Sequence, residues 1–288
     1  MRLLVTADLH YNHPKSKGLA EEVIDKMNDA GGDVLLVVGD TAAADGDAFE
    51  RCLGRFKFPG PKLVVAGNHE LWTAGPDSYT LLHESFPERA TALGWQWLQD
   101  EPYITDQLAI VGSVGWYDYS FAQPNLHIPT RFYEHKISPG AAERFEEFKF
   151  LFERTDDLTA ATREIVARWN DGRHVKLGRS DRQFLDELLL QLDQQLTSLR
   201  DKPQVITAVH HLPFRELLPP PHSAQWDFAK AYLGAEAIGQ ALLKHANVSH
   251  VFCGHSHMAG DLTVGHIRAI NIGSGYRSKT FHTLDLPD

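Results

Sequence analysis

Cysteine is scarce in this sequence, which has only Cys52 and Cys253 among 288 residues. Two thiols without a Cys-x-x-Cys motif exclude a disulfide framework, and their apolar neighbours indicate buried free thiols. Long apolar runs are lacking as well. The run that opens the chain is too short for a signal peptide, and no stretch approaches the roughly 20 apolar residues of a membrane span. We therefore expect a soluble, cytoplasmic protein without a membrane partner.

Positive charge is also in deficit, since 28 Lys and Arg face 38 Asp and Glu, for a formal net charge of −10. This balance argues against the basic stripe that most nucleic-acid-binding proteins carry. A small anionic substrate that meets local positive charge stays compatible with it. One local basic patch, Arg173, Lys176 and Arg179, keeps a nucleic-acid substrate open, although a solvated face is the favoured interpretation.

What the sequence does contain is a repeated pattern, in which an apolar strand runs into a short loop of Asp, His or Asn. Strands are predicted over 3–6, 33–38, 62–66, 108–114, 204–209 and 248–253, with closing strands over 267–272 and 280–284. The polar residues that follow these strands are Asp8, His10, Asp40, Asn68, His69, His210, His255 and His257. Continuous apolar strands separated by helices favour a sheet covered on both faces, with ligands bound beyond the strands' carboxyl ends.

Helices are predicted over 19–27, 47–55, 181–199 and 235–245. The third has a capping box, Ser180 with Gln183, and a stripe of leucines. The segment 121–202 is interpreted as a mostly helical insertion in a single domain over 1–288. Within it Phe145, Phe148 and Phe152 have helical spacing, as do Ile165 and Trp169.

The polar loop residues suit a metal centre. Carboxylate, imidazole and amide oxygen together favour borderline divalent metals such as Mn, Fe or Zn, and the lack of Cys argues against a closed structural zinc site. Eight residues are too many for one ion and about right for two. Two ions roughly 3.5–4 Å apart need a bridging carboxylate and can clamp a displacement at phosphorus.

The ordered set Asp8-Leu9-His10, Gly39-Asp40, Gly67-Asn68-His69-Glu70, His210 and Gly254-His255-Ser256-His257 resembles the calcineurin-like metallophosphoesterase superfamily. The resemblance implies an α/β fold, a four-layer β-sandwich flanked by helices. It also implies a ligand set: Asp8, His10 and His257 for one metal, Asn68, His210 and His255 for the second, and Asp40 bridging both. His69 would not be a ligand and would stand beside the leaving group as a general acid or charge stabiliser.

Two positions depart from the family pattern or need a choice. Ala43 stands where the family often has a second acid, which is not usually a ligand. Adjacent strand residues face opposite ways, so only one of His210 and His211 can be a ligand. We expect His210 to be the ligand and His211 to lie near the pocket. Glu70 is either a partner that fixes the imidazoles or a solvated loop acid.

Trp116 and Tyr117, which follow the strand over 108–114, are candidates for a substrate wall, and packing is the equal alternative. The expected activity is hydrolysis of a small phosphoester, with nucleotides among the candidates, by a hydroxide that bridges the two metals. Mn²⁺ is the first expectation for the metal, with Fe or Zn as alternatives. A DNA or RNA nuclease is the alternative enzyme. A non-catalytic scaffold is the alternative of another class, although such a protein should have lost ligands that are all present here.

Overall fold

The structure is a computed structural model that describes residues 1–75 and 77–286. One of its two sheets has five strands, in the order β11-β1-β2-β3-β4. These are β1 (Arg2–Thr6), β2 (Val34–Val38), β3 (Lys62–Val65), β4 (Gln96–Trp97) and β11 (His282–Asp285). Strands β1 to β4 pair in parallel, and β11 joins β1 as an antiparallel edge.

The other sheet has six strands, in the order β5-β6-β7-β8-β10-β9. They are β5 (Tyr103–Ile104), β6 (Leu108–Ser113), β7 (Gln204–Val209), β8 (Val248–Cys253), β9 (Gly260–Val264) and β10 (Ile267–Asn271). The four central strands are parallel, and β5 and β9 are antiparallel edges. Parallel strands place their carboxyl ends at one edge of the sheet, where the polar loops begin.

The central strands are apolar throughout because both of their faces are covered. Along β2, Val34, Leu36 and Val38 belong to the core between the two sheets. Leu35 and Val37 point the other way, into the core beneath the helices. Successive side chains of a strand alternate between faces, so two apolar environments require an unbroken apolar run.

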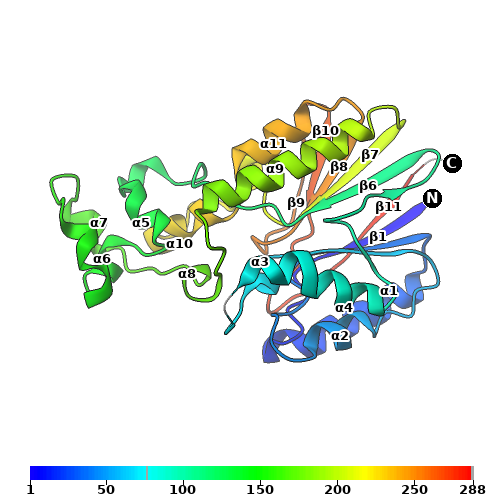
Figure 1. Ribbon diagram of the computed structural model, residues 1–288, viewed down its shortest axis with the longest axis horizontal. Coiled ribbons are helices and arrows are strands. Elements are labelled where there is room, and N and C mark those ends of the chain that lie inside the picture. The colour runs from blue at the N-terminus through cyan, green and yellow to red at the C-terminus, as the bar shows by residue number, and fades with distance from the viewer. Residues whose placement is uncertain (76, 287–288) are drawn as a thin grey trace.

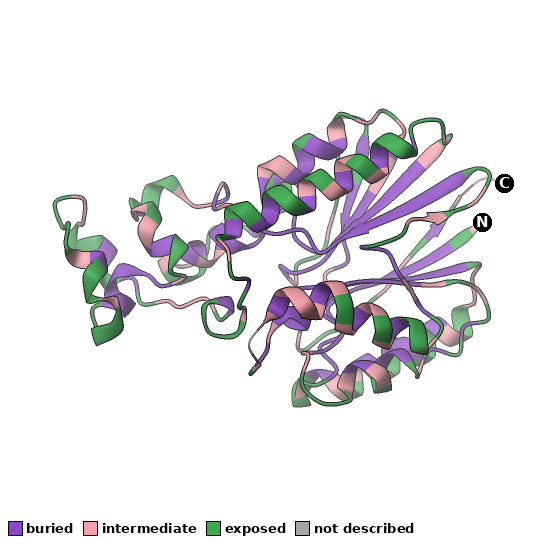
Figure 2. Ribbon diagram, in the orientation of Figure 1, coloured by how far each residue is buried: buried purple, intermediate pink, exposed green. Residues whose placement is uncertain are grey.

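Helices cover the outer faces of both sheets (Figure 1). Helices α1 (Pro14–Ala30), α2 (Ala48–Leu53) and α4 (Phe86–Ala92) lie over the five-stranded sheet. Helices α9 (Asp181–Ser198) and α11 (Glu236–Leu243) lie over the other. Figure 2 shows that the strands are mostly buried, while these helices expose their outward faces. The predicted fold class, two sheets flanked by helices, is confirmed.

A group of short helices extends from one end of this sandwich (Figure 1). We call residues 121–180 together with α10 the helical lobe. Its elements are η3 (Pro124–Leu126), α5 (Thr130–Glu134), α6 (Pro139–Ala142), η4 (Glu146–Phe152), α7 (Ala160–Glu164), α8 (Asp171–His174) and α10 (Ala224–Ala229). The lobe has a small core of its own around Phe132, Ile137 and Leu151. The remaining short elements are η1 (His69–Leu71), α3 (Ser78–Thr80), η2 (Leu81–Ser85), η5 (Arg215–Leu217) and η6 (Lys230–Tyr232).

The predicted helical insertion over 121–202 comprises two structurally different parts. Residues up to 180 lie in the lobe, whereas α9 packs against β6 and α11 as part of the outer helical layer. One continuous apolar cluster nevertheless runs from α1 to Tyr133 and Phe228 in the lobe. For this reason we propose that the chain is a single domain, as the sequence predicts for 1–288.

Some predictions of individual helices and strands are confirmed and others are wrong. The capping box of Ser180 and Gln183 is confirmed at the start of α9. The helix predicted from Ile165 and Trp169 is wrong, because α7 ends at Glu164 and Arg168 forms an isolated β-bridge with Ile137. Strand β9 was not predicted, since an edge strand with half-exposed residues lacks a clear apolar run. Within the described residues no helix is both long and apolar enough to cross a bilayer.

Candidate metal centre

The loops that follow β1, β2, β3, β7 and β8 meet at one edge of the sandwich, beside the helical lobe. They bring together every residue predicted from the motifs: Asp8, His10, Asp40, Asn68, His69, His210, His255 and His257. Of these only His257 is partly exposed. Residues from distant parts of the chain therefore form one buried polar cluster.

Asp8, His10, Asp40 and His257 form the first group of potential metal ligands. His10 Nε2 lies 3.0 Å from His257 Nε2 and 3.6 Å from Asp40 Oδ2. His257 Nε2 lies 3.5 Å from Asp8 Oδ1. Ligand atoms about 2.1 Å from one ion are about 3.0–3.5 Å from one another, so these spacings fit a shared cation.

Asp40, His210 and His255 form the second group, with ligand atoms within 4.8 Å of one another. His210 Nε2 lies 3.4 Å from Asp40 Oδ2. Asn68 adds an amide oxygen beside this group, since Oδ1 of Asn68 is buried without a hydrogen-bond partner among the described residues. Asp40 therefore belongs to both groups, which is the arrangement that a bridging carboxylate requires.

Backbone carbonyls orient the two imidazoles of the second group. His210 donates from Nδ1 to the carbonyl of Val38 at 2.9 Å, which directs its buried Nε2 at Asp40 Oδ2, 3.4 Å away. His255 donates from Nε2 to the carbonyl of Tyr232 at 3.2 Å and keeps Nδ1 for the site. Such hydrogen bonds select the tautomer that presents a lone pair to a metal.

The protonation states of His10, His255 and Asp40 also suit metal binding. Burial lowers the pKa values of His10 and His255 well below the usual value, which keeps both imidazoles neutral. Burial opposes ionisation of Asp40, but His210, His69 and His10 overcome it and hold the pKa of Asp40 well below its usual range. The same pairing raises the pKa of His210 to about 9 in spite of burial, so His210 is protonated in the metal-free protein and a bound metal would displace its Nε2 proton.

The backbone at the site is held in an unusual conformation. Asp8, His10, Asp40, His255 and His257 all have positive φ, between +43° and +66°. Positive φ is uncommon outside glycine and costs on the order of 1–3 kcal/mol per residue. Five strained residues in one cluster indicate that their positions are set by function rather than by folding alone.

The glycines of two motifs are required by close approach. A Cβ on Gly67 would lie 2.2 Å from Asp40 Oδ1, and one on Gly254 would lie 2.3 Å from Asp8 Oδ2. Any larger residue would push a carboxylate out of its group. Each carboxylate also accepts a backbone N–H from the same motif: Asp40 from His69 at 2.9 Å and Asp8 from His255 at 3.0 Å.

Glu70 is fully buried, so its interpretation as a solvated loop acid is wrong. Its carboxylate accepts the backbone N–H groups of Asp40 at 3.0 Å, Ala42 at 3.0 Å and Gly67 at 2.6 Å. Burial and the charge of Asp40 raise the pKa of Glu70 to about 7. The described contacts of Glu70 are with the backbone and not with an imidazole, so it ties two ligand-bearing loops together.

Asp171, from α8 in the lobe, is a residue that the sequence reasoning missed. It is fully buried and accepts four hydrogen bonds. The donors are Asn68 Nδ2 at 2.8 Å, Trp72 Nε1 at 2.7 Å, Trp169 Nε1 at 2.7 Å and Tyr117 OH at 3.1 Å. By holding the amide nitrogen of Asn68, Asp171 turns the oxygen toward the second group. No local pattern marks Asp171 in the sequence.

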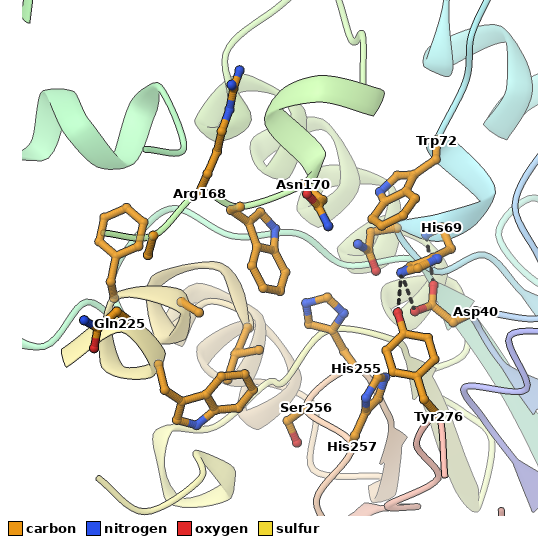
Figure 3. Close-up of a pocket in the computed structure, with 17 residues that line it drawn as sticks. Asp40, His69, Trp72, Arg168, Asn170, Gln225, His255, Ser256, His257 and Tyr276 are labelled. Atoms are coloured by element: carbon orange, nitrogen blue, oxygen red, sulfur yellow. Dashed lines mark hydrogen bonds and ion pairs between the residues drawn. The ribbon is translucent and has the colours of Figure 1, made fainter. Parts of the chain in front are cut away.

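His69 lies at the metal edge of the pocket without joining either group (Figure 3). Its Nε2 is 3.9 Å from Asp40 Oδ2 and 3.4 Å from the hydroxyl of Tyr276. The ring stacks on Trp72 with centroids 3.7 Å apart. Burial lowers the pKa of His69. Trp72 and Tyr276, neither of them predicted, thus hold His69 from two sides.

The structure does not bring Trp116, Tyr117 or His211 to the pocket surface. All three are fully buried. Trp116 donates to Asp181 at 2.8 Å, Tyr117 donates to Asp171, and His211 donates to the carbonyl of Val114 at 2.9 Å. All three pack beneath the pocket and contact residues outside its lining. Their positions therefore do not support the predicted contact with substrate.

A pocket of about 350 Å³ opens in front of the two groups (Figure 3). Asp40, Asn68, His69, His255 and His257 line one part of it. The remaining lining comes mainly from the lobe and from Trp72 and Tyr276. A cavity of this size, with a few convergent polar groups, is typical of a small-molecule site.

The sequence of this chain matches a known protein family. The profile of the calcineurin-like phosphoesterase family matches residues 1–259. The chain therefore belongs to this family, as the ordered motifs predicted. No curated protein sequence shows significant similarity to the chain.

Similar folds occur among solved structures. Phosphopantetheinyl hydrolase from Mycobacterium tuberculosis has a TM-score of 0.65 and 20% identity, covering 96% of this chain and 89% of that one. A dimetal phosphatase from Danio rerio has a TM-score of 0.53 and 17% identity, covering 98% and 91%. The anchor protein of the inner membrane complex of Plasmodium has a TM-score of 0.51 and 8% identity, covering 99% and 81%.

Since one of these folds belongs to an anchor protein, similarity of fold does not by itself separate an enzyme from a scaffold. The enzyme is distinguished by membership of the family together with two intact groups of potential metal ligands. The chain is an enzyme, a metal-dependent hydrolase of phosphoesters. The family uses two divalent metals. The donor set fits such ions, as do Asn68 Oδ1 and His210 Nε2, which are buried without a hydrogen-bond partner among the described residues.

Proposed function

We propose that this enzyme is a phosphatase or phosphodiesterase that acts on small substrates. The observation that carries the proposal is that two ligand groups share Asp40 at the wall of a pocket of about 350 Å³. Phosphoryl transfer needs positive charge on both sides of phosphorus, and a shared carboxylate is how a protein holds two cations close together.

In this proposal Asp8, His10 and His257 hold one metal, and Asn68, His210 and His255 hold the other, with Asp40 between them. Mn²⁺ is the expected ion, with Fe or Zn as alternatives. When bound, the two cations would polarise the phosphoryl group and lower the pKa of water.

The side chains of His69 and Tyr276 would assist hydrolysis together with the metals. Both line the pocket, and their side chains lie 3.4 Å apart. A neutral imidazole or a phenol can donate a hydrogen bond to an oxygen on which charge develops. The stack with Trp72 fixes the plane of the His69 ring, so the direction of this bond would be set before substrate arrives.

A small substrate is favoured over DNA or RNA by the state of the basic patch. Lys176 donates to the carbonyl of Gly75 at 2.7 Å, and Arg179 pairs with Glu187. Of the three basic residues only Arg173 lacks such a partner among the described contacts. A nucleic-acid substrate would need several free cations along its path.

The test is hydrolysis of bis-p-nitrophenyl phosphate and p-nitrophenyl phosphate after removal of metal and reloading with Mn²⁺, Fe²⁺ or Zn²⁺. We expect turnover that depends on added metal and is abolished by Asp40→Ala. Undiminished turnover in the Asp40 variant would refute the shared site. The small-substrate part of the proposal is tested by assaying further compounds beside these esters: cyclic nucleotides, a nucleoside 5′-monophosphate, phosphopantetheine and single-stranded DNA.

A further inference from the structure

The half of the pocket that lies away from the ligand groups is apolar. Its lining comes from the lobe and the turn that follows it: Ala167, Trp169, Trp226, Phe228, Ala229 and Leu233. Apart from Arg168, the polar side chains there are the neutral amides Asn170 and Gln225. This wall adjoins the metal edge directly, so one ligand can touch both.

Among the described lining residues, Arg168 is the one cation in this half, and its guanidinium is engaged by side chains outside the pocket. The guanidinium lies over the rings of Phe145 and Phe148, 5.4 Å and 5.2 Å from their centroids. It also reaches Glu147 at 3.5 Å. Figure 3 shows the head group pointing away from His255 and Asp40. No ionised side chain of the described lining therefore faces the apolar half.

The apolar wall is rigid at Trp169 and exposed to solvent at Trp226. The indole of Trp169 is held by its hydrogen bond to Asp171 and lies parallel to Tyr232, with centroids 5.3 Å apart. Trp226 in α10 remains 37% exposed although it is a large aromatic residue. An exposed Trp on the rim of an apolar cavity is free to cover a bound group.

We propose that this half of the pocket binds an uncharged, apolar or aromatic group esterified to the phosphate that the metal centre holds. The substrate class is then a phosphoester of an apolar or aryl alcohol, and nucleoside polyphosphates and charged esters are poor ligands. The inference rests on the proposed function of the metal centre. Its physical basis is that an ionised group would lose water in this half without gaining a partner of opposite charge, whereas an apolar group gains by burial.

Binding of phosphonates to the Mn²⁺-loaded protein, measured by titration calorimetry, tests the proposal without turnover. The series is methyl-, butyl-, hexyl- and benzylphosphonate, with 4-carboxybutylphosphonate as the charged arm. We expect the Kd to fall about three- to fourfold per added methylene, as about 0.8 kcal/mol per buried CH₂ implies, until the pocket is full. The carboxylate arm should bind more weakly than the butyl arm.

Variants locate the effect. Trp226→Ala should flatten the dependence on chain length, and Trp226→Phe should restore part of it. Phe150→Ala is the matched control, because Phe150 is an exposed aromatic of the lobe that does not line the pocket, so its series should match that of the unmodified protein. Equal binding of the charged and butyl arms, or the same slope in Trp226→Ala, would overturn the inference. Failure of methylphosphonate to bind at all would instead refute the proposed function.

Discussion

Asp40 shows how much a single side chain does at this site. One of its oxygens, Oδ2, is near His10, His69 and His210, while the other, Oδ1, accepts the backbone N–H of His69. The carboxylate is thus held by the loop after β3 and presented to both ligand groups. The sequence marks this residue clearly, because a Gly-Asp pair closes an apolar strand.

Asp171 is the opposite case, a residue that only its contacts reveal. We expect Asp171→Asn to weaken the binding of one of the two metals by about 10–100-fold, the usual effect of removing a partner that orients a ligand. The reason is that an amide NH₂ in place of one oxygen would face donors among Asn68, Trp72 and Trp169. Metal stoichiometry and Kd from calorimetry measure the effect.

Asp186→Asn is the control for this variant, because Asp186 is an exposed acid on α9 outside the pocket lining. Two metals bound with unchanged affinity by Asp171→Asn would show that Asn68 does not need its lobe partner.

His211 predicts a pH dependence. Burial and the neighbouring His210 lower the pKa of His211 to about 3, against about 6.5 in the unfolded chain. A lowered histidine pKa means that the unfolded state takes up the proton first, so stability present above pH 6.5 is lost as the pH falls. Between pH 7 and pH 5 this residue should account for about 2 kcal/mol of lost unfolding free energy.

Urea unfolding of metal-free protein at both pH values, for the unmodified chain and for His211→Gln, isolates that contribution. The variant should lose less stability on acidification than the unmodified chain does. Equal losses would mean that His211 takes up a proton to the same extent in the folded and the unfolded state.

At the scale of elements, the motif loops work because glycine lets two segments touch. Gly254→Ala should displace the Asp8 carboxylate, since the new Cβ would lie 2.3 Å from Asp8 Oδ2. We expect a loss of about 1–3 kcal/mol in unfolding free energy, as for other overpacked sites, together with weaker metal binding. Thermal unfolding and metal content after dialysis are the measurements.

Gly18→Ala is a matched control in α1, where a Cβ would meet nothing within 4 Å. That substitution should be neutral or stabilising by about 0.5–1 kcal/mol, since alanine is the better helix former. If Gly254→Ala behaves like this control, the close approach in the loop is not what demands glycine.

At the scale of the whole molecule, the ligand groups gather segments from both sheets, so metal binding should stabilise the entire fold. Removal of metal with EDTA should lower Tm, and Mn²⁺ should restore it. A ligand at 100 times its Kd contributes about 2.7 kcal/mol per site. Five residues of the ligand loops have positive φ, and metal binding would offset the strain that this conformation costs.

Scanning calorimetry with and without Mn²⁺ measures this effect, and Asp40→Ala serves as the reference. A Tm that does not respond to metal in the unmodified chain, or responds equally in the variant, would contradict a shared centre at Asp40.

The sequence by itself determined the central strands, the polar loops and the family, because each depends on residues that are close together in the chain. An apolar strand followed by Gly-Asp or Gly-Asn-His-Glu is a local pattern, and parallel strands bring such loops to one edge. Tertiary structure alone decided which side chains support them. Asp171 reaches Asn68 across 103 residues, and Trp226 reaches the pocket from a helix beyond β7. Short lobe helices have no periodicity that predicts where they pack, so the metal edge could be read from the sequence and the apolar wall could not.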